Sequence, residues 1–157
     1  MAEHSHQFAL ASRIVELSEA NSWNAAKLEW KLDSIWFVQE GDEPETCLCG
    51  HYPIIEVCVI QNRENGNVTE VGNVCVNKFL GLGSKIIFDG IKRVRGDITK
   101  ALNGAAIDYA YEKRWINSWE HGFLHDTKRK RRLSFAQADK REQLNKKVLR
   151  LSVRQES

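Results

Sequence analysis

The stretch from Cys47 to Cys75, CLCGHYPIIEVCVIQNRENGNVTEVGNVC, contains all four cysteines of the 157-residue chain. Single cysteines scattered through a sequence are typical of ordinary core positions, because the thiol is one of the most buried side chains. Four cysteines confined to one window instead indicate a shared site, either disulfides or a bound metal ion. The stretch therefore predicts a metal centre in any compartment that keeps thiols reduced.

The order of residues within this window predicts how the chain returns to one point. Cys47 and Cys49 flank a single residue, and Gly50 follows, which allows a tight turn. The run 54–62 is rich in isoleucine and valine, and Asn65-Gly66 is a hairpin signal, so we expect two paired strands between residues 54 and 72. Asn73 can then cap a helix that carries Cys75 in its first turn, where unpaired amides favour a thiolate.

We therefore predict a Zn²⁺ ion bound by Cys47, Cys49, Cys75 and a fourth ligand. Cys58 would complete a site that uses every thiol, whereas His51 is closer in sequence to the turn and would leave Cys58 as a buried apolar residue. Strand alternation does not decide between Cys58 and His51, because it does not show which face of the strand looks at the metal. Four protein ligands leave no position for water, so the zinc is expected to be structural.

The arrangement resembles two known groups of proteins. A turn with two cysteines, a hairpin and a ligand in the first turn of a helix resembles the layout of treble-clef zinc modules. The wider pattern resembles small uncharacterised bacterial and bacteriophage zinc-binding proteins. It comprises Cys47, Cys49, Gly50, Ile60, Asn62, Asn65, Gly66, Val71, Gly72, Cys75, Val76 and Phe79, together with a C-terminal helix over 131–149. This resemblance spans about residues 28–150 and implies a phage or mobile-element setting without implying an activity.

The rest of the sequence predicts mainly helices. We expect a helix over 8–21, a strand over 30–38, and helices over 84–103, 105–114 and 117–128, with a last helix that begins at Ser134. The predicted fold class is α+β: a zinc knuckle and hairpin with a short sheet, followed by a C-terminal helical bundle. We expect a single domain, 1–157, made of an acidic segment 1–46, a zinc-hairpin-helix module 47–80 and a basic helical segment 84–157. Trp115 and Trp119 are expected in the core.

Charge is distributed unevenly along the chain. Residues 1–46 hold 3 basic and 9 acidic residues, whereas residues 112–157 hold 13 basic and 6 acidic residues. Such asymmetry indicates a nucleic-acid or acidic partner for the basic end. The residues expected to make that contact are Lys128, Arg129, Lys130, Arg131, Arg132, Lys146, Lys147 and Arg150.

We therefore expect a non-enzymatic, zinc-stabilised protein that binds nucleic acid or a nucleoprotein complex. The first alternative is a phage inhibitor that binds a host protein complex, such as a nucleic-acid-targeting defence complex, through its acidic N-terminal third. The second is a metal-dependent nuclease with a site at His121, His125 and Asp126, although no glutamate lies between the histidines to act as a base. The chain has no signal-peptide pattern and no long apolar run, so we expect a cytoplasmic protein, in the bacterial host if phage-encoded, without a membrane partner.

Overall fold

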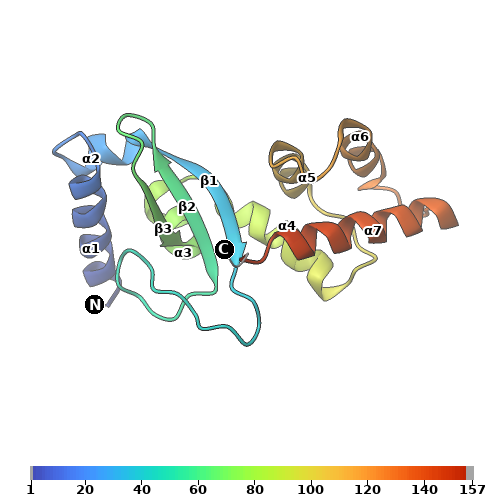
Figure 1. Ribbon diagram of the computed structural model, residues 1–157, viewed down its shortest axis with the longest axis horizontal. Helices are drawn as coiled ribbons and strands as arrows, with labels where there is room; N and C mark the ends of the chain where they lie inside the picture. Colours follow the sequence, from blue (N-terminus) through green and yellow to red (C-terminus); the bar gives the residue numbers. More distant parts are fainter. Residues whose placement is uncertain (1, 155–157) are drawn as a thin grey trace. The chain divides into compact units, whose positions relative to one another are not determined.

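The computed structural model describes residues 2–154. Its contacts divide the chain into two compact units, with the boundary in the sequence between Lys85 and Ile86. Over the described residues the protein has seven α-helices and one three-stranded antiparallel sheet (Figure 1). The predicted α+β class is thus confirmed. All three strands lie in the first unit, and the second unit is helical.

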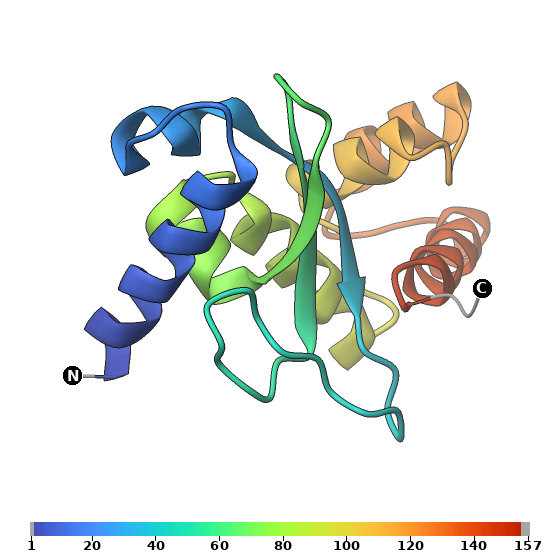
Figure 2. The ribbon, with the colours of Figure 1, turned by 60° about the vertical axis from the view of Figure 1, so that its left-hand side comes forward.

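The first unit combines short helices with the sheet. Its helical elements are α1 (Ala2–Leu17), α2 (Trp23–Ala26), the 3₁₀ turn η1 (Lys27–Glu29), α3 (Asn73–Cys75) and the π-helical turn η2 (Val76–Leu80). Its strands are β1 (Trp30–Phe37), β2 (Glu56–Asn62) and β3 (Val68–Gly72), as the sequence predicted. The long connection between β1 and β2 forms loops at one end of the sheet (Figure 2).

The strands follow one another in the order β1-β2-β3, with β2 in the centre. Cys58 in the middle of β2 is paired with Ile35 on β1 and with Val71 on β3, and all three side chains are fully buried. The β1–β2 register shifts between Leu32 and Ser34, where one extra residue forms a bulge. The centre of the sheet is therefore a closely packed apolar layer.

The Asn-Gly hairpin turn also ends helix α1. The side-chain amides of Asn65 and Asn67 donate hydrogen bonds of 2.9 and 2.8 Å to the carbonyl of Leu17, the last residue of α1. A helix leaves its last carbonyls without intrahelical partners, and these amides supply one. The sequence predicted that this helix ends near Asn21, but it ends at Leu17, whose carbonyl accepts the two side-chain amides of the turn.

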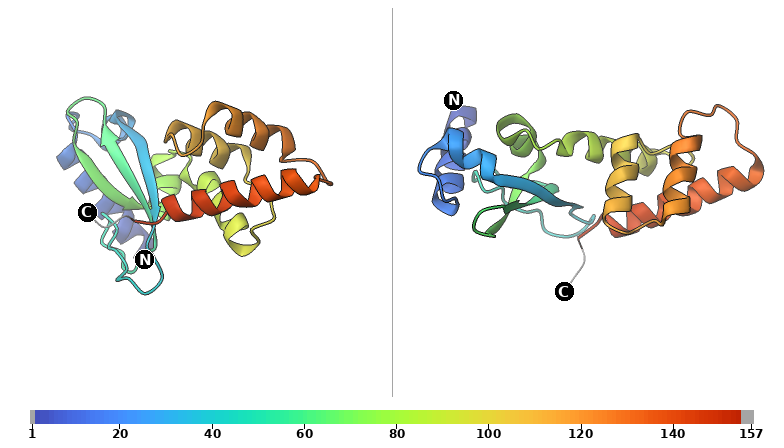
Figure 3. Two further views of the ribbon diagram at one scale, coloured as in Figure 1. Left: turned by 45° about the vertical axis from the view of Figure 1, so that its right-hand side comes forward. Right: turned by 90° about the horizontal axis from the view of Figure 1, so that it is seen from above.

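The second unit holds most of α4 (Ser84–Gly96), then α5 (Gly104–Glu112), α6 (Ser118–Thr127) and α7 (Phe135–Leu151). Helices α5 and α6 lie side by side (Figure 3). Three side chains cap these helices: Asn103 begins α5, and Asn117 and Ser134 begin α6 and α7 in complete capping boxes. The predicted starts of these helices are confirmed to within a residue or two.

Membrane insertion is not supported by any helix between residues 2 and 154, since none combines the length and the apolar character that a crossing requires.

Candidate functional site

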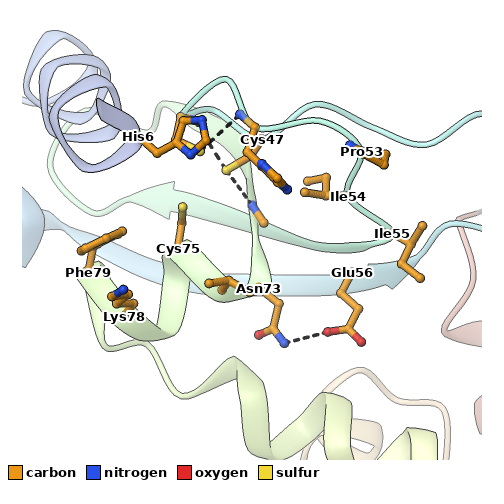
Figure 4. A pocket seen from close by; sticks show the side chains of 14 residues that line it. His6, Cys47, Pro53, Ile54, Ile55, Glu56, Asn73, Cys75, Lys78 and Phe79 are labelled. Carbon is orange, nitrogen blue, oxygen red and sulfur yellow. Dashed lines mark hydrogen bonds between the residues drawn. The ribbon is translucent and has the colours of Figure 1, made fainter. Parts of the chain in front are cut away.

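Three of the four cysteines converge in the first unit. The sulfur atoms of Cys47, Cys49 and Cys75 all lie within 4.8 Å of one another, and all three residues are buried. Cys47 and Cys49 come from the loop before β2, and Cys75 comes from α3, which lies on the opposite side of the cluster (Figure 4). The structure thus brings together residues that are 28 positions apart, and this group can hold a metal ion.

The turn that follows Cys47 holds two of these thiols close together. The N–H of Gly50 donates to the carbonyl of Cys47 at 2.8 Å, and the N–H of Cys47 donates to the carbonyl of His51 at 2.9 Å. Gly50 has a φ of +93°, in the left-handed region that glycine adopts without strain. The predicted tight turn after the second cysteine is therefore confirmed.

Backbone amides point at the sulfur atoms. Cys47 Sγ accepts hydrogen bonds from the N–H groups of Cys49 at 3.5 Å and Gly72 at 3.2 Å, and Cys49 Sγ accepts one from His51 at 3.4 Å. A Cβ atom on Gly72 would lie 3.5 Å from Cys47 Sγ and 3.3 Å from Ile54, so the absence of a side chain lets the end of β3 approach the thiol closely. Such amide donors stabilise thiolates, which is the form of cysteine that binds metals.

The three thiols cannot all ionise easily at this spacing. The pKa of Cys47 is lowered to about 5, because the Cys75 thiol and the amides of Cys49 and Gly72 donate to its sulfur. The pKa of Cys75 is raised, because its proton is held by Cys47 and because its side chain is buried beside that charge. Burial also raises the pKa of Cys49. One thiolate thus holds its neighbours protonated, and a dication at the centre would remove that restriction.

The helical end of the cluster is fixed by a polar network around Asn73. Its side-chain amide donates to Glu56 at 2.9 Å, while its Oδ1 accepts hydrogen bonds of 2.6 Å from Ser84 and from Asn77. The sequence predicted that Asn73 caps α3, but Asn73 is the first residue of the helix and Gly72 occupies the cap position. The network therefore fixes the start of α3, the short helix that carries Cys75 two residues later.

Cys58 is not part of the cysteine group. Its side chain is fully buried in the sheet, and its hydrogen-bonding partner is Ser84. Burial raises the pKa of Cys58 to about 12, so this thiol stays protonated at neutral pH. The sequence favoured Cys58 as fourth ligand, but strand β2 holds its side chain in the apolar layer, outside the group formed by the other three thiols.

The cluster opens into a cavity of about 560 Å³ that is lined by the three thiols and also by His6 and His51. The two imidazole rings are 5.4 Å apart in an edge-to-face arrangement. His51 was the alternative fourth ligand from the sequence, and the structure places it on the wall of the same cavity, outside the group of three thiols. His6, on α1, was not anticipated, since the sequence gives no sign that the first helix reaches this cavity.

Most of the predicted nucleic-acid residues are exposed in the second unit. Arg129, Lys130, Arg131 and Arg132 lie in the segment between α6 and α7, and no hydrogen bond or ion pair joins their side chains to another part of the described chain. Lys146 and Arg150 on α7 are also exposed, and Lys147 is half-buried. Within the basic segment, residues 128–132, the four side chains from Arg129 to Arg132 thus present their positive charge to solvent, whereas the Lys128 ammonium contacts His125 Nδ1 at 2.8 Å.

The start of the basic segment is held in place by Arg141. This residue is buried on α7, and its guanidinium donates to the carbonyl of Thr127 at 2.6 Å, at the end of α6. Burial lowers the pKa of Arg141, and the charge of Arg93 lowers it further. The basic segment therefore leaves α6 at a fixed point.

Two aromatic residues in this unit are largely exposed, and one of them was expected in the core. Trp119 is 64% exposed and stacks on Phe123 with a ring separation of 5.3 Å, and Phe135 is 91% exposed at the first position of α7. The prediction that Trp119 belongs to the core is therefore wrong. Helical spacing placed Trp119 on the same face as Trp115, but Trp119 lies in the first turn of α6, where its ring stacks on the surface of its own helix.

The two histidines of α6 also have an unexpected partner. His121 and His125 both contact Asp108 on α5, whereas the sequence suggested Asp126 as the neighbouring carboxylate. Asp126 is exposed and is not part of this group.

Comparison of the chain with protein-family models, with curated proteins and with solved structures gave no match.

Proposed function

We propose that the chain is a non-enzymatic binding protein, stabilised by zinc in its first unit, that contacts nucleic acid through the basic segment, residues 128–132. The zinc would be held by the thiolates of Cys47, Cys49 and Cys75, with His51 as the fourth ligand. On this proposal the turn, hairpin and helix start form a treble-clef-like module, and the helices of the second unit form a basic bundle.

The donor set supports zinc. Sulfur ligands at about 2.3 Å from a tetrahedral ion lie about 3.8 Å from one another, so thiols within 4.8 Å need only small movements to bind. Three thiolates and an imidazole are soft and borderline ligands, which favour Zn²⁺ over Mg²⁺ or Ca²⁺. Four protein ligands leave no open position, so the ion would stabilise the fold rather than activate water.

One observation carries the nucleic-acid part of the proposal: four consecutive cations, Arg129 to Arg132, are exposed without an acidic partner in the described chain. Isolated surface cations are usually paired loosely with nearby carboxylates. A run of unpaired cations lowers the free energy of a polyanion beside it and releases the counterions of its phosphates. Nucleic acid is the polyanion that this chemistry fits best.

The exposed aromatic rings favour a single strand over a duplex. Phe135 follows Arg132 by three positions and is almost completely exposed. Bases of single-stranded nucleic acid stack on such rings, with a contribution of about 1–3 kcal/mol per base. The cations would contact the phosphates while Phe135 offers a surface for a base.

We predict that the protein binds a fluorescently labelled single-stranded oligonucleotide and that affinity falls steeply between about 50 and 200 mM salt. Replacing Arg129, Arg131 and Arg132 by Ala should weaken binding and lower the slope of log K against log salt by about 2, because each phosphate contact to a single strand contributes about 0.7. Fluorescence anisotropy across the salt series measures both quantities.

The matched control removes the same charge from the first unit. Arg13, Lys31 and Arg63 are exposed there, and their replacement by Ala should leave the salt slope unchanged. Equal losses in the two triple variants would show that only net charge matters. Absence of binding at the lowest salt concentration would remove the proposal and leave a protein partner as the alternative.

A further inference from the structure

The second unit contains a cluster of metal-ligating side chains that the proposed function does not use. Asp108 Oδ1 lies 2.8 Å from His121 Nε2 and 2.7 Å from His125 Nε2. All three ligand atoms lie within 4.8 Å of one another. The group contains two imidazoles and one carboxylate, contributed by α5 and α6.

The backbone around this group is well defined on both sides. His121 and His125 are one helical turn apart on α6, which begins at the Asn117 capping box. Asp108 lies in α5, which begins at the Asn103 cap. The ring of His121 is further held by stacking on Tyr111, with a centroid distance of 4.4 Å. The cluster therefore rests on two capped helices rather than on a loop.

We propose that Asp108, His121 and His125 form a second metal site, which binds a borderline divalent cation such as Zn²⁺ through Asp108 Oδ1 and the two Nε2 atoms. Imidazole nitrogens and a carboxylate oxygen at about 2.0–2.2 Å from a tetrahedral ion lie about 3.3 Å from one another. The present separations of 2.7 and 2.8 Å are those of hydrogen bonds. Opening them by about half an ångström would admit the ion in place of the shared protons.

The exposure of the ligands is compatible with this small movement. The side chains of His121 and His125 are 29% and 26% exposed, and that of Asp108 is 65% exposed. Because the protein supplies only three ligands, solvent would fill the remaining position, unlike the predicted four-ligand site of the first unit.

The position of Lys128 is compatible with the metal-free arrangement of this cluster but not with the metal-bound one. Its ammonium lies 2.8 Å from His125 Nδ1, which can accept this hydrogen bond only if the ring proton is on Nε2. Metal binding at Nε2 requires the proton on Nδ1, so Lys128 must then turn away. Lys128 therefore competes with the metal, both through this hydrogen bond and through its positive charge.

The test is isothermal titration of the full chain, purified with the thiol site already loaded with zinc, using ZnCl₂ as titrant. We expect one further equivalent to bind. His125→Ala and the nearly isosteric Asp108→Asn should each weaken this second event by more than tenfold, since loss of even an outer partner of a metal ligand costs about 10–100-fold. Lys128→Ala should bind the second equivalent at least as tightly as the wild type.

Two controls keep the result specific. His4→Ala removes one histidine from the first unit and should leave the second event unchanged. Circular dichroism of each variant shows whether the helices are retained, and the Lys128→Ala result would remain decisive if a ligand variant failed to fold. Absence of a second equivalent, its persistence in both ligand variants, or weaker binding in Lys128→Ala would overturn the proposal.

Discussion

Burial raises the pKa of Cys58 to about 12, whereas hydrogen bonds from Cys75 and from two amides lower that of Cys47 to about 5. Both residues are buried cysteines of the same unit, so burial alone does not decide their chemistry. The hydrogen bond from Cys75 makes the largest difference, and the amides of Cys49 and Gly72 add to it, because all three favour the charged form of Cys47 that binds metal. Cys58 behaves instead as a small apolar side chain in the sheet.

Glu29 is a second residue whose charged state is stabilised by the fold. Its carboxylate accepts a hydrogen bond of 3.0 Å from the Asn62 side chain and bonds of 2.8 Å from the N–H groups of Glu19 and Ala20. These bonds lower the pKa of Glu29 below its usual value of 4.5. The carboxylate thus joins the chain after α1 to the hairpin turn.

We predict that Glu29→Gln destabilises the protein at about pH 7 and that this effect shrinks below about pH 4. Because the folded pKa is lowered, the stabilisation is present above the unfolded value and is lost as the pH falls through the folded pKa. Urea unfolding of the wild type and the variant at the two pH values measures the difference in their free energies of unfolding. Any loss of metal at low pH affects both proteins and cancels in this difference. An equal difference at both pH values would contradict the assignment.

The sequence predicted contacts that follow from patterns of neighbouring residues, but it did not predict contacts that depend on how separate elements pack together. The turn at Gly50 and the approach of Cys75 followed from local patterns. The exclusion of Cys58 did not, because a period of two residues shows that a strand has two faces without showing which face meets the metal. Asp108 was missed for a related reason: it meets His121 only when α5 and α6 pack together, and nothing near His121 in the sequence signals this contact.

At the scale of single elements, the starts of α4 to α7 were predicted well, whereas the start of α1 and the ends of α1 and α4 were not. Ser134 and Asn117 carry their capping signals within three residues of the helix start, so the sequence alone contains them. Helix α4 was expected to continue to residue 103 but ends at Gly96. The carbonyls of Ile98 and Lys100 accept hydrogen bonds of 2.9 and 2.7 Å from Asn145, and this long-range pairing replaces further helical turns.

The packing of α4 against the start of α5 depends on Gly90. A Cβ atom there would lie 2.6 Å from Asn103 Cγ, and Asn103 caps α5 by accepting a hydrogen bond of 2.8 Å from Ala106. We predict that Gly90→Ala destabilises the protein by about 1–3 kcal/mol, because the added methyl group displaces the capping side chain. Thermal or denaturant unfolding measures this change.

Gly96, in the same helix, is the matched control. A Cβ atom on Gly96 would meet no atom within 4 Å, so Gly96→Ala should change stability by no more than about 0.5 kcal/mol. Similar losses in the two variants would show that general helix effects, rather than the contact with Asn103, decide the result.

At the scale of the whole molecule, the two proposed roles fall in different units. The thiol cluster and its cavity lie in the first unit, and the exposed cations and the His-Asp cluster lie in the second. The sequence predicted one domain with an acidic start and a basic end. In the structure the basic segment lies in the helical unit that begins at Ile86. The charge of Arg129 to Arg132 is not neutralised by the helices of that unit.

The central claim is that a metal ion bound by three thiolates holds the first unit together. The most direct test is the zinc content per chain, measured by native mass spectrometry, of the wild type, Cys47→Ser/Cys75→Ser and Cys58→Ser. We predict that the double variant contains one equivalent less than the wild type and melts at a lower temperature, because binding of structural zinc contributes on the order of 10–16 kcal/mol to folding. Cys58→Ser should retain the full zinc content. Equal zinc content in the wild type and the double variant, or loss of an equivalent in Cys58→Ser, would contradict the account.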